Sequence, residues 1–414
     1  MPRDDRSPAG AVKRRPKDRK AQIARASANA FSAMGYHAVS MDDIARAVGI
    51  SAAALYRHSS SKYELFRDAV LSLGQQLVDA TAFADQTDET DGAAAEPAAV
   101  LDELVAALID TAIANRTSGG LYRWEGRYLH GDDQATLMAQ VKLVNRRLQQ
   151  PLSQLRPGLT SRDRWTLSAA TLSVIGSIAD HRARMSISEI RSVLRDLAFA
   201  TLGAELPNGV PASARADDIQ PLPDAGRYEA LLRASMTLFN ERGYRETGME
   251  DIATAVGMPA SGIYRYFGGK ADILAAAFHR AADRVSGDVA EIVAAEPDPE
   301  RAIIRLIAAY VARSFDDPAL AYVYYTERAN LPTADQAILR NIQRSTVAAW
   351  VRLLVAARPE LTPTAARFAV HAALALVVDI GRLVQYDNTE ESRACVRRMM
   401  EVTVLGQRAA VPLS

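Results

Sequence analysis

The chain contains two copies of one segment, and this repetition constrains its fold more than any other feature. Residues 23–70 align with residues 231–278 without a gap, at a constant offset of 208, and share their glycine, aromatic and apolar positions. Fainter similarity continues downstream at an offset of 202, where Asp133-Gln134-Ala135 recurs as Asp335-Gln336-Ala337. Self-similarity over this length indicates two complete modules in tandem.

Each copy begins with the pattern of three helices. Residues 19–34 place apolar side chains on one helical face, and Gly35 then ends the helix. Ser40 and Ser51 are favourable N-caps for two short helices, which are joined by a turn at Gly49. Longer amphipathic segments follow, and the abundance of alanine together with 6% aromatic residues favours helices over strands. We therefore expect an all-α fold.

Two short helices joined by a glycine turn, with a longer helix before them, predict a helix-turn-helix unit. In this unit the second short helix enters the major groove, where Arg57 has the chemistry to pair with a guanine edge. Tyr56, His58 and Lys62 have the chemistry to reach phosphates. The full predicted DNA-contacting set is Arg14, Arg15, Ser40, Ser51, Tyr56, Arg57, His58, Lys62, Ser261, Tyr264, Arg265, Tyr266 and Lys270.

A basic segment, residues 13–20, precedes the first copy. Residues 1–70 hold 13 Lys/Arg against 7 Asp/Glu, although the whole chain has no net charge. Two interpretations stay open. The segment is either an arm that reaches the adjacent minor groove, or a tail that adds only nonspecific attraction to DNA.

The pattern GYxxxSMDDIAxAVGISxxxLYRHxxxK, followed by a long helical region, resembles the TetR family of bacterial transcriptional regulators. The resemblance implies a tandem duplication of a helix-turn-helix head with a helical domain for ligand binding and dimerisation. The tandem arrangement is further similar to the double-TetR repressors of mycobacterial mammalian-cell-entry operons, which implies a lipid or acyl-type effector. The expected divisions are a first head (13–70), a first regulatory domain (71–203), a linker (204–226), a second head (227–280) and a second regulatory domain (281–410).

The two copies differ at positions that bear on the heads. Ser59 stands where the second copy has Phe267, so we expect the first head to lose packing beneath its recognition helix. Gly248 stands where the first copy has Ser40, which predicts a weaker helix cap, although Thr247 lies one residue away. The two heads are therefore expected to read unequal half-sites.

The helical regions offer pairing surfaces and a ligand pocket. Residues 161–203 and 363–408 are the expected pairing surfaces, because family members join through their last two helices. Pairing within the chain predicts a single-chain pseudo-dimer, and pairing between chains predicts a homodimer with four heads; both stay open. Aromatic rings beside polar groups suit an amphipathic ligand, and the candidate pocket residues are Trp124, Arg127, Tyr128, Tyr324, Tyr325 and Arg328.

The sequence argues against an enzyme. It has one cysteine, Cys395, six scattered histidines, and no nucleophile-elbow, phosphate-loop or dinucleotide motif, so we expect no catalytic residue, cofactor or metal. The longest apolar run, residues 368–378, is too short to cross a bilayer, so we expect a cytoplasmic protein of the bacterial nucleoid. The sequence thus predicts a ligand-responsive repressor that binds double-stranded DNA. The alternative is a small-molecule-binding helical protein in which one or both heads no longer bind DNA.

Overall fold

The computed structural model describes residues 16–85, 96–207 and 226–406, and every regular element in these ranges is a helix. The first module comprises α1 (Pro16–Ala38), α2 (Met41–Val48), α3 (Ala52–Tyr56), α4 (Lys62–Ala80), η1 (Ala82–Asp85), α5 (Pro97–Ala114), α6 (Gly120–Trp124), η2 (Gly126–Tyr128), α7 (Gly131–Leu155), α8 (Ser161–Gly176), η3 (Ser177–Ala179) and α9 (Ile187–Leu202).

The second module repeats this order of helices. It comprises α10 (Gly226–Arg242), α11 (Met249–Ala255), α12 (Ala260–Ile263), α13 (Lys270–Ala295), α14 (Pro299–Asp316), α15 (Pro318–Thr326), η4 (Arg328–Asn330), α16 (Thr333–Ala357), α17 (Pro363–Leu383) and α18 (Glu390–Leu405). The predicted all-α tandem duplication is confirmed.

Local sequence signals set the helix boundaries in the first head. Gly35 has φ of 78°, which interrupts α1 at the predicted place, and Gly49 ends α2 in the left-handed region with φ of 71°. Ser40 and Asp43 form a reciprocal capping box at the start of α2.

The second head has a poorer cap at the matching position. Gly248 precedes α11, and the carboxylate of Asp251 accepts its backbone N–H at 2.7 Å. Gly248 has no side chain with which to complete the box. Thr247 does not substitute for it, because its hydroxyl is buried and donates to the Gly243 carbonyl at 2.9 Å.

The apolar side chains form separate head cores and one shared regulatory core. Phe31, Ile44, Leu55 and Phe66 are fully buried in the first head, and an equivalent cluster around Phe239 fills the second. The largest cluster runs from α5, α7, α8 and α9 of the first module into α14, α16, α17 and α18 of the second. The two regulatory bundles therefore fold against each other.

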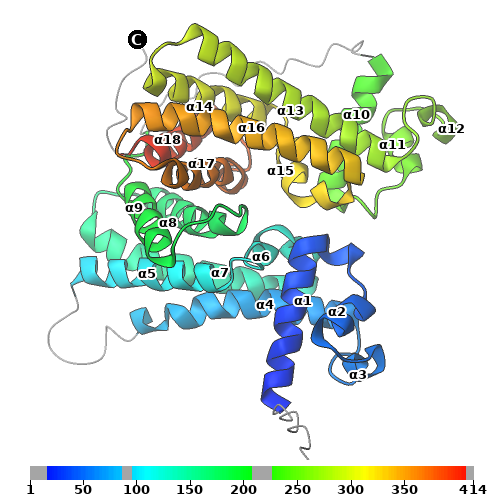
Figure 1. The fold of residues 1–414 in the computed structure, drawn as a ribbon, viewed down its shortest axis with the longest axis horizontal. Helices are drawn as coiled ribbons and strands as arrows, with labels where there is room; N and C mark the ends of the chain where they lie inside the picture. Colours follow the sequence, from blue (N-terminus) through cyan, green and yellow to red (C-terminus); the bar gives the residue numbers. More distant parts are fainter. Residues whose placement is uncertain (1–15, 86–95, 208–225, 407–414) are drawn as a thin grey trace, which may run out of the picture.

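The contact between the modules is made by the predicted pairing helices. Helix α8 packs against α17, and α9 packs against α18, so that one bundle lies on the other (Figure 1). Helix α17 is long and apolar enough to cross a membrane by length and composition, but 72% of that window is buried, as expected of a core helix.

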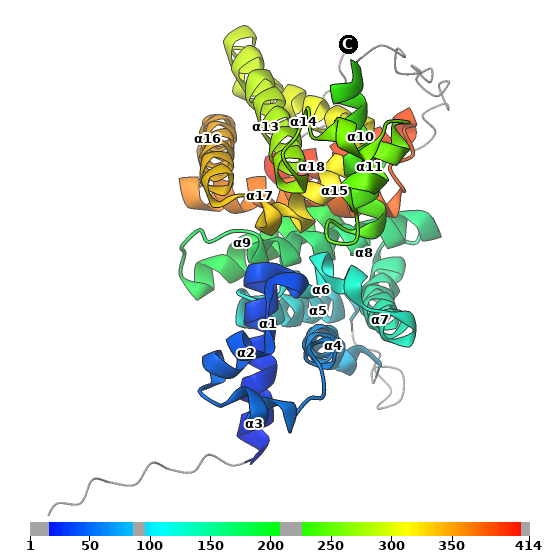
Figure 2. The same cartoon turned by 90° about the vertical axis from the view of Figure 1, so that its right-hand side faces the viewer.

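Both heads lie at the same side of the molecule. Helices α3 and α12 are on the right in Figure 1, and Figure 2 turns that side toward the viewer. Each head continues into its bundle through one unbroken helix, α4 or α13, so the expected divisions at 70 and 280 fall within continuous helices. Most of the expected linker, residues 208–225, lies outside the described residues.

Candidate DNA-binding heads and ligand pocket

The first head presents three adjacent side chains at the end of α3. Leu55 is fully buried and fixes the helix on the head core, whereas Tyr56, Arg57 and His58 are exposed. Tyr56 has 54% of its surface exposed, which is unusual for an aromatic ring without a partner. None of the three side chains has a hydrogen-bond or ion-pair partner among the described residues, so their polar groups are available to DNA.

The second head repeats this arrangement with one chemical difference. Ile263 is buried, and Tyr264, Arg265 and Tyr266 are exposed at the end of α12. Their side chains likewise lack a hydrogen-bond partner in the described part of the chain. A tyrosine thus replaces the histidine of the first head, which changes what the two triples can recognise.

The predicted serines divide between two roles. Ser40 Oγ accepts the Asp43 backbone N–H at 3.2 Å, and Ser51 Oγ accepts the Ala54 N–H at 3.1 Å, so both hydroxyls cap helices. Ser261 is exposed on α12 and stays a predicted DNA contact. Arg14 and Arg15 lie outside the described residues.

The two lysines predicted to reach phosphates are half-buried and make contacts within the heads. Lys62 Nζ donates to the His37 carbonyl at 3.3 Å and lies 4.7 Å from the centre of the Tyr36 ring. Lys270 Nζ donates to the Tyr244 carbonyl at 2.7 Å and lies 4.8 Å from that ring. Partial burial lowers the pKa of both lysines. Each ammonium therefore ties its long helix to the turn before the helix-turn-helix, and its contact with a DNA phosphate stays a prediction.

Ser59 and Phe267 occupy equivalent buried positions, with 8% and 6% exposure. The Phe267 ring stacks on Tyr228 with centroids 5.0 Å apart, whereas the first head has Lys20 at the tyrosine position. Ser59 Oγ lies 3.2 Å from Glu64 Oε2, to which it donates. The first head thus lacks the aromatic pair and uses hydrogen bonds to Glu64 in its place.

A cavity of about 760 Å³ opens in the second module among α10, α13, α14, α15, α16 and α17. Aromatic rings of Tyr310, Tyr324, Tyr325 and Trp350 line it, together with polar side chains from other helices. Two of the predicted pocket residues, Tyr324 and Tyr325, are therefore in the wall. The other four predicted residues do not line it: Trp124, Arg127, Tyr128 and Arg328.

The first module has no comparable space at the matching place. The cavity there measures about 30 Å³ and is lined mainly by leucine, isoleucine and alanine side chains. At the offset of 202, the positions of Tyr310 and Trp350 are taken by Leu108 and Leu148, both fully buried. The first bundle is packed to near completion where the second is hollow.

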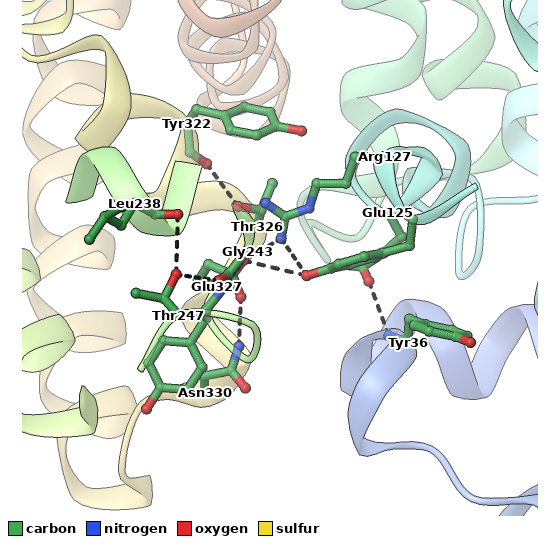
Figure 3. Close-up of polar contacts among 12 residues, drawn as sticks. Tyr36, Glu125, Arg127, Leu238, Gly243, Thr247, Tyr322, Thr326, Glu327 and Asn330 are labelled. Carbon is green, nitrogen blue, oxygen red and sulfur yellow. Dashed lines mark hydrogen bonds and ion pairs between the residues drawn. The ribbon is translucent and has the colours of Figure 1, made fainter. Parts of the chain in front are cut away.

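A buried carboxylate, Glu125, lies beside the first head. Its Oε2 accepts the Tyr36 backbone N–H at 3.0 Å, and 8% of its surface is exposed (Figure 3). Burial raises the pKa of Glu125 to about 7, and the nearby Glu327 carboxylate acts in the same direction. The hydrogen bond from Tyr36 and the Arg127 charge oppose the shift. The 202-residue offset relates Glu125 to Glu327, and the sequence suggests both as pocket-wall residues, but it does not predict their contacts with the heads.

Replacing Glu125 with glutamine is expected to remove a pH-dependent part of the stability. The pKa of Glu125 is raised from 4.5 in the unfolded chain to about 7, so its stabilising proton is present below pH 4.5 and lost as the pH rises through 7. A shift of that size corresponds to ~3 kcal/mol. Urea unfolding between pH 4.5 and 8 measures this loss in the wild-type chain and its reduction in Glu125→Gln, which keeps an acceptor for Tyr36. The exposed Glu391→Gln serves as control, and equal pH dependence in Glu125→Gln and the wild type contradicts the prediction.

Comparison with known proteins agrees with this geometry. Residues 23–69 and 231–277 each match the model for bacterial regulatory proteins of the tetR family. The HTH-type transcriptional activator FasR of Mycolicibacterium smegmatis is 43% identical over 68 residues, 16% of this chain and 31% of that protein. The uncharacterized HTH-type transcriptional regulator Rv1255c of Mycobacterium tuberculosis is 29% identical over 100 residues, 24% of this chain and 50% of that protein. The matches thus span a third to a half of these relatives.

Among solved structures, the fatty acid degradation regulator FadR of Bacillus halodurans is 22% identical, and the match covers 44% of this chain and 96% of that chain with a TM-score of 0.37. The two heads therefore have the helix-turn-helix architecture that this family model describes. The chain belongs to the TetR family and carries two fused TetR-type modules in one polypeptide.

Proposed function

We propose that the protein is a ligand-responsive repressor whose two heads bind one DNA duplex as a single-chain pseudo-dimer. One observation carries this proposal. Two exposed triples, residues 56–58 and 264–266, lie at one side of a chain whose pairing helices already contact each other. A second chain is then not needed to bring two heads to the duplex, and the local concentration of the second head favours its binding.

The two half-sites are expected to be unequal. The recognition segments differ at Ser51 and Pro259, at Ala53 and Ser261, and at His58 and Tyr266. These pairs differ in hydrogen-bonding groups, which read base edges and phosphates. The operator is therefore expected to lack the full twofold symmetry of sites bound by homodimers.

The effector is expected to bind in the second module only and to be an amphipathic anion such as a lipid or its acyl derivative. The aromatic wall suits an apolar chain, and the exposed Arg233 and Arg284 are among the lining residues and suit an acidic group. Arg233 belongs to α10, the first helix of the second head. A ligand that fills the cavity therefore contacts a helix of the second head, shifts that head, and changes the spacing of the two heads on DNA.

Phenylalanine at Thr346 is expected to block the cavity, which Thr346 lines from α16. Decanoate is the probe, with decanol as an uncharged counterpart. The binding of decanoate is followed by the change in tryptophan fluorescence, to which Trp350 in the cavity wall contributes, and by loss of DNA affinity. We expect the dissociation constant for decanoate to rise at least ~10-fold in Thr346→Phe because the apolar contacts are lost. Ile338→Phe, on an exposed position of the same helix, is the matched control. Unchanged decanoate binding in Thr346→Phe contradicts the assignment of the pocket.

A helical ligand-binding protein that has lost DNA binding is the competing function, and salt dependence separates the two. A regulator with ~6–10 phosphate contacts is expected to lose ~10³–10⁵ in DNA affinity between 50 and 200 mM salt. Selection of binding duplexes from random DNA tests the proposal itself. Enrichment of a duplex with two unlike half-sites supports the proposed function. If no duplex is enriched at low salt without ligand, the result favours the competing function, a cytoplasmic ligand-binding protein that does not bind DNA.

A further inference from the structure

Related glutamates hold the turns that enter the two helix-turn-helix units. Glu125 accepts the backbone N–H of Tyr36 at 3.0 Å, and Glu327, related to it by the 202-residue offset, accepts the N–H of Tyr244 at 3.4 Å. Both carboxylates are buried, with 8% and 1% exposure. Because each turn leads directly into the short helices of its head, each glutamate fixes the orientation of one head on its own bundle.

The positive charge of one arginine, Arg127, acts on both glutamates. Arg127 of the first module crosses to the second, where its Nη2 donates to Glu327 Oε1 (Figure 3). Its positive charge also lowers the pKa of Glu125. The second module has Ala329 at the matching position, so the arrangement is not repeated by the approximate symmetry. An arginine at position 329 as well would bring two like charges together at this contact, and they would repel. Because the two modules are in one chain, their sequences can differ, and only the first module carries the arginine.

The guanidinium of Arg127 is enclosed rather than solvated. Its side chain is 16% exposed, and its Nε and Nη1 are buried without a hydrogen-bond partner among the described residues. It lies over the Tyr128 ring, 4.7 Å from the centroid, and Nη2 also donates to the Tyr128 hydroxyl at 2.8 Å. A buried charge of this kind is costly unless its partner is held in place, so the pair favours one arrangement of the modules over others.

Tyr128 extends this contact to both heads. Its ring lies 4.7 Å from that of His37 and 5.7 Å from that of Tyr36, centroid to centroid, on the first head. On the second head, its hydroxyl lies 3.7 Å from the point where a side chain on Gly243 would begin. Arg127 and Tyr128 therefore lie between the two turns that lead into the recognition units.

We propose that Arg127 is a positioning residue that locks the two heads in one relative orientation and so restricts the half-site spacing that the chain accepts. This inference rests on the proposed function, in which both heads read one duplex. Without the guanidinium, each glutamate still holds its own head, but the heads are no longer tied to each other. The chain then tolerates a wider range of spacings, and the affinity for the preferred spacing falls.

The first test needs no DNA. Spin labels are attached at Ala47→Cys and Ala255→Cys, which are exposed and equivalent in the two heads, in a Cys395→Ser background. We expect a single narrow distance distribution with Arg127 present and a distribution at least ~2-fold broader in Arg127→Met. The double variant Arg127→Met/Glu327→Gln removes both members of the ion pair between the modules, so that Glu327 is not left as an unpaired buried charge, and it guards against simple misfolding. Equal widths in all of these proteins overturn the proposal.

The second test uses the duplex that the wild-type chain selects, with one base pair added or removed between its half-sites. We expect the wild-type chain to lose about 100-fold in affinity on this change and the double variant to lose less than about 10-fold. Arg162→Met, which removes the exposed Arg162–Glu391 pair between the modules, should behave as wild type, and Arg127→Lys should restore part of the discrimination.

The two tests distinguish a failure of the positioning role of Arg127 from a failure of the proposed DNA-binding function. If the wild-type chain selects no DNA, the proposed function fails, and the distances between the spin labels alone show whether Arg127 fixes the relative orientation of the heads. If the wild-type chain binds and the double variant discriminates spacing equally well, the positioning role of Arg127 is overturned while the regulator stands.

Discussion

Alanine at Arg265 is expected to weaken binding to the selected duplex by ~1–3 kcal/mol and to relax the preference for one base in one half-site. The guanidinium is exposed, lacks a partner in the described part of the chain, and follows a buried helix end that fixes its direction. Arg57→Ala should have the same effect on the other half-site. Fluorescence anisotropy at a fixed salt concentration, on the selected duplex and its single-base variants, measures both effects.

The matched control is Arg352→Ala, which removes the same charge from an exposed position toward the end of α16. It should leave base preference unchanged. If Arg57→Ala and Arg265→Ala both bind like the wild-type chain, then α3 and α12 are not the recognition helices, and the assignment of both triples is wrong.

Methionine at Arg123 is expected to lower the free energy of unfolding by ~3–5 kcal/mol, because it leaves two largely enclosed carboxylates without their counter-ion. Arg123 has 7% of its side chain exposed and pairs with Asp180 at 3.2 Å and with Asp379 of the second module at 2.5 Å. The substitution therefore removes one of the charges that join the two modules. Urea unfolding followed by far-ultraviolet circular dichroism measures the loss.

Arg162→Met provides the comparison for this prediction. It breaks another ion pair between the modules, with Glu391, but both side chains are well exposed, so a loss below ~1 kcal/mol is expected. Neutralising both partners of Arg123 as well, with Asp180→Asn and Asp379→Asn, should recover part of the stability. A loss in Arg123→Met as small as that in Arg162→Met contradicts the prediction.

Much of the fold can be predicted from the sequence because the determining signals are local. Gly35, Gly49 and Ser40 act within a few residues of themselves, and the structure has the breaks and the cap at these positions. The repeat adds a second, independent instance of each signal. The exposed triples follow from the same patterns, since a buried Leu55 or Ile263 fixes which neighbours face outward.

The inner polar network could not be predicted in this way. Lys62 carries the charge and exposure pattern of a phosphate contact, but its ammonium lies on the Tyr36 ring and on a carbonyl 25 residues away. Arg127 and Glu327 are 200 residues apart, and only the packing of the two bundles brings them together. The cavity of the second module could not be predicted either, because the larger aromatic side chains stand there where the first module has leucines, and cavity volume is set by three-dimensional packing.

The central claim is that one chain places two different heads on one duplex. Footprinting of the purified protein on its selected duplex, combined with native mass spectrometry of the same complex, tests this most directly. If the proposed function holds, we expect one chain per duplex and protection of two unlike half-sites whose centres lie about one helical turn, ~34–36 Å, apart. Two chains per duplex, or protection of a single half-site by one chain, would contradict it.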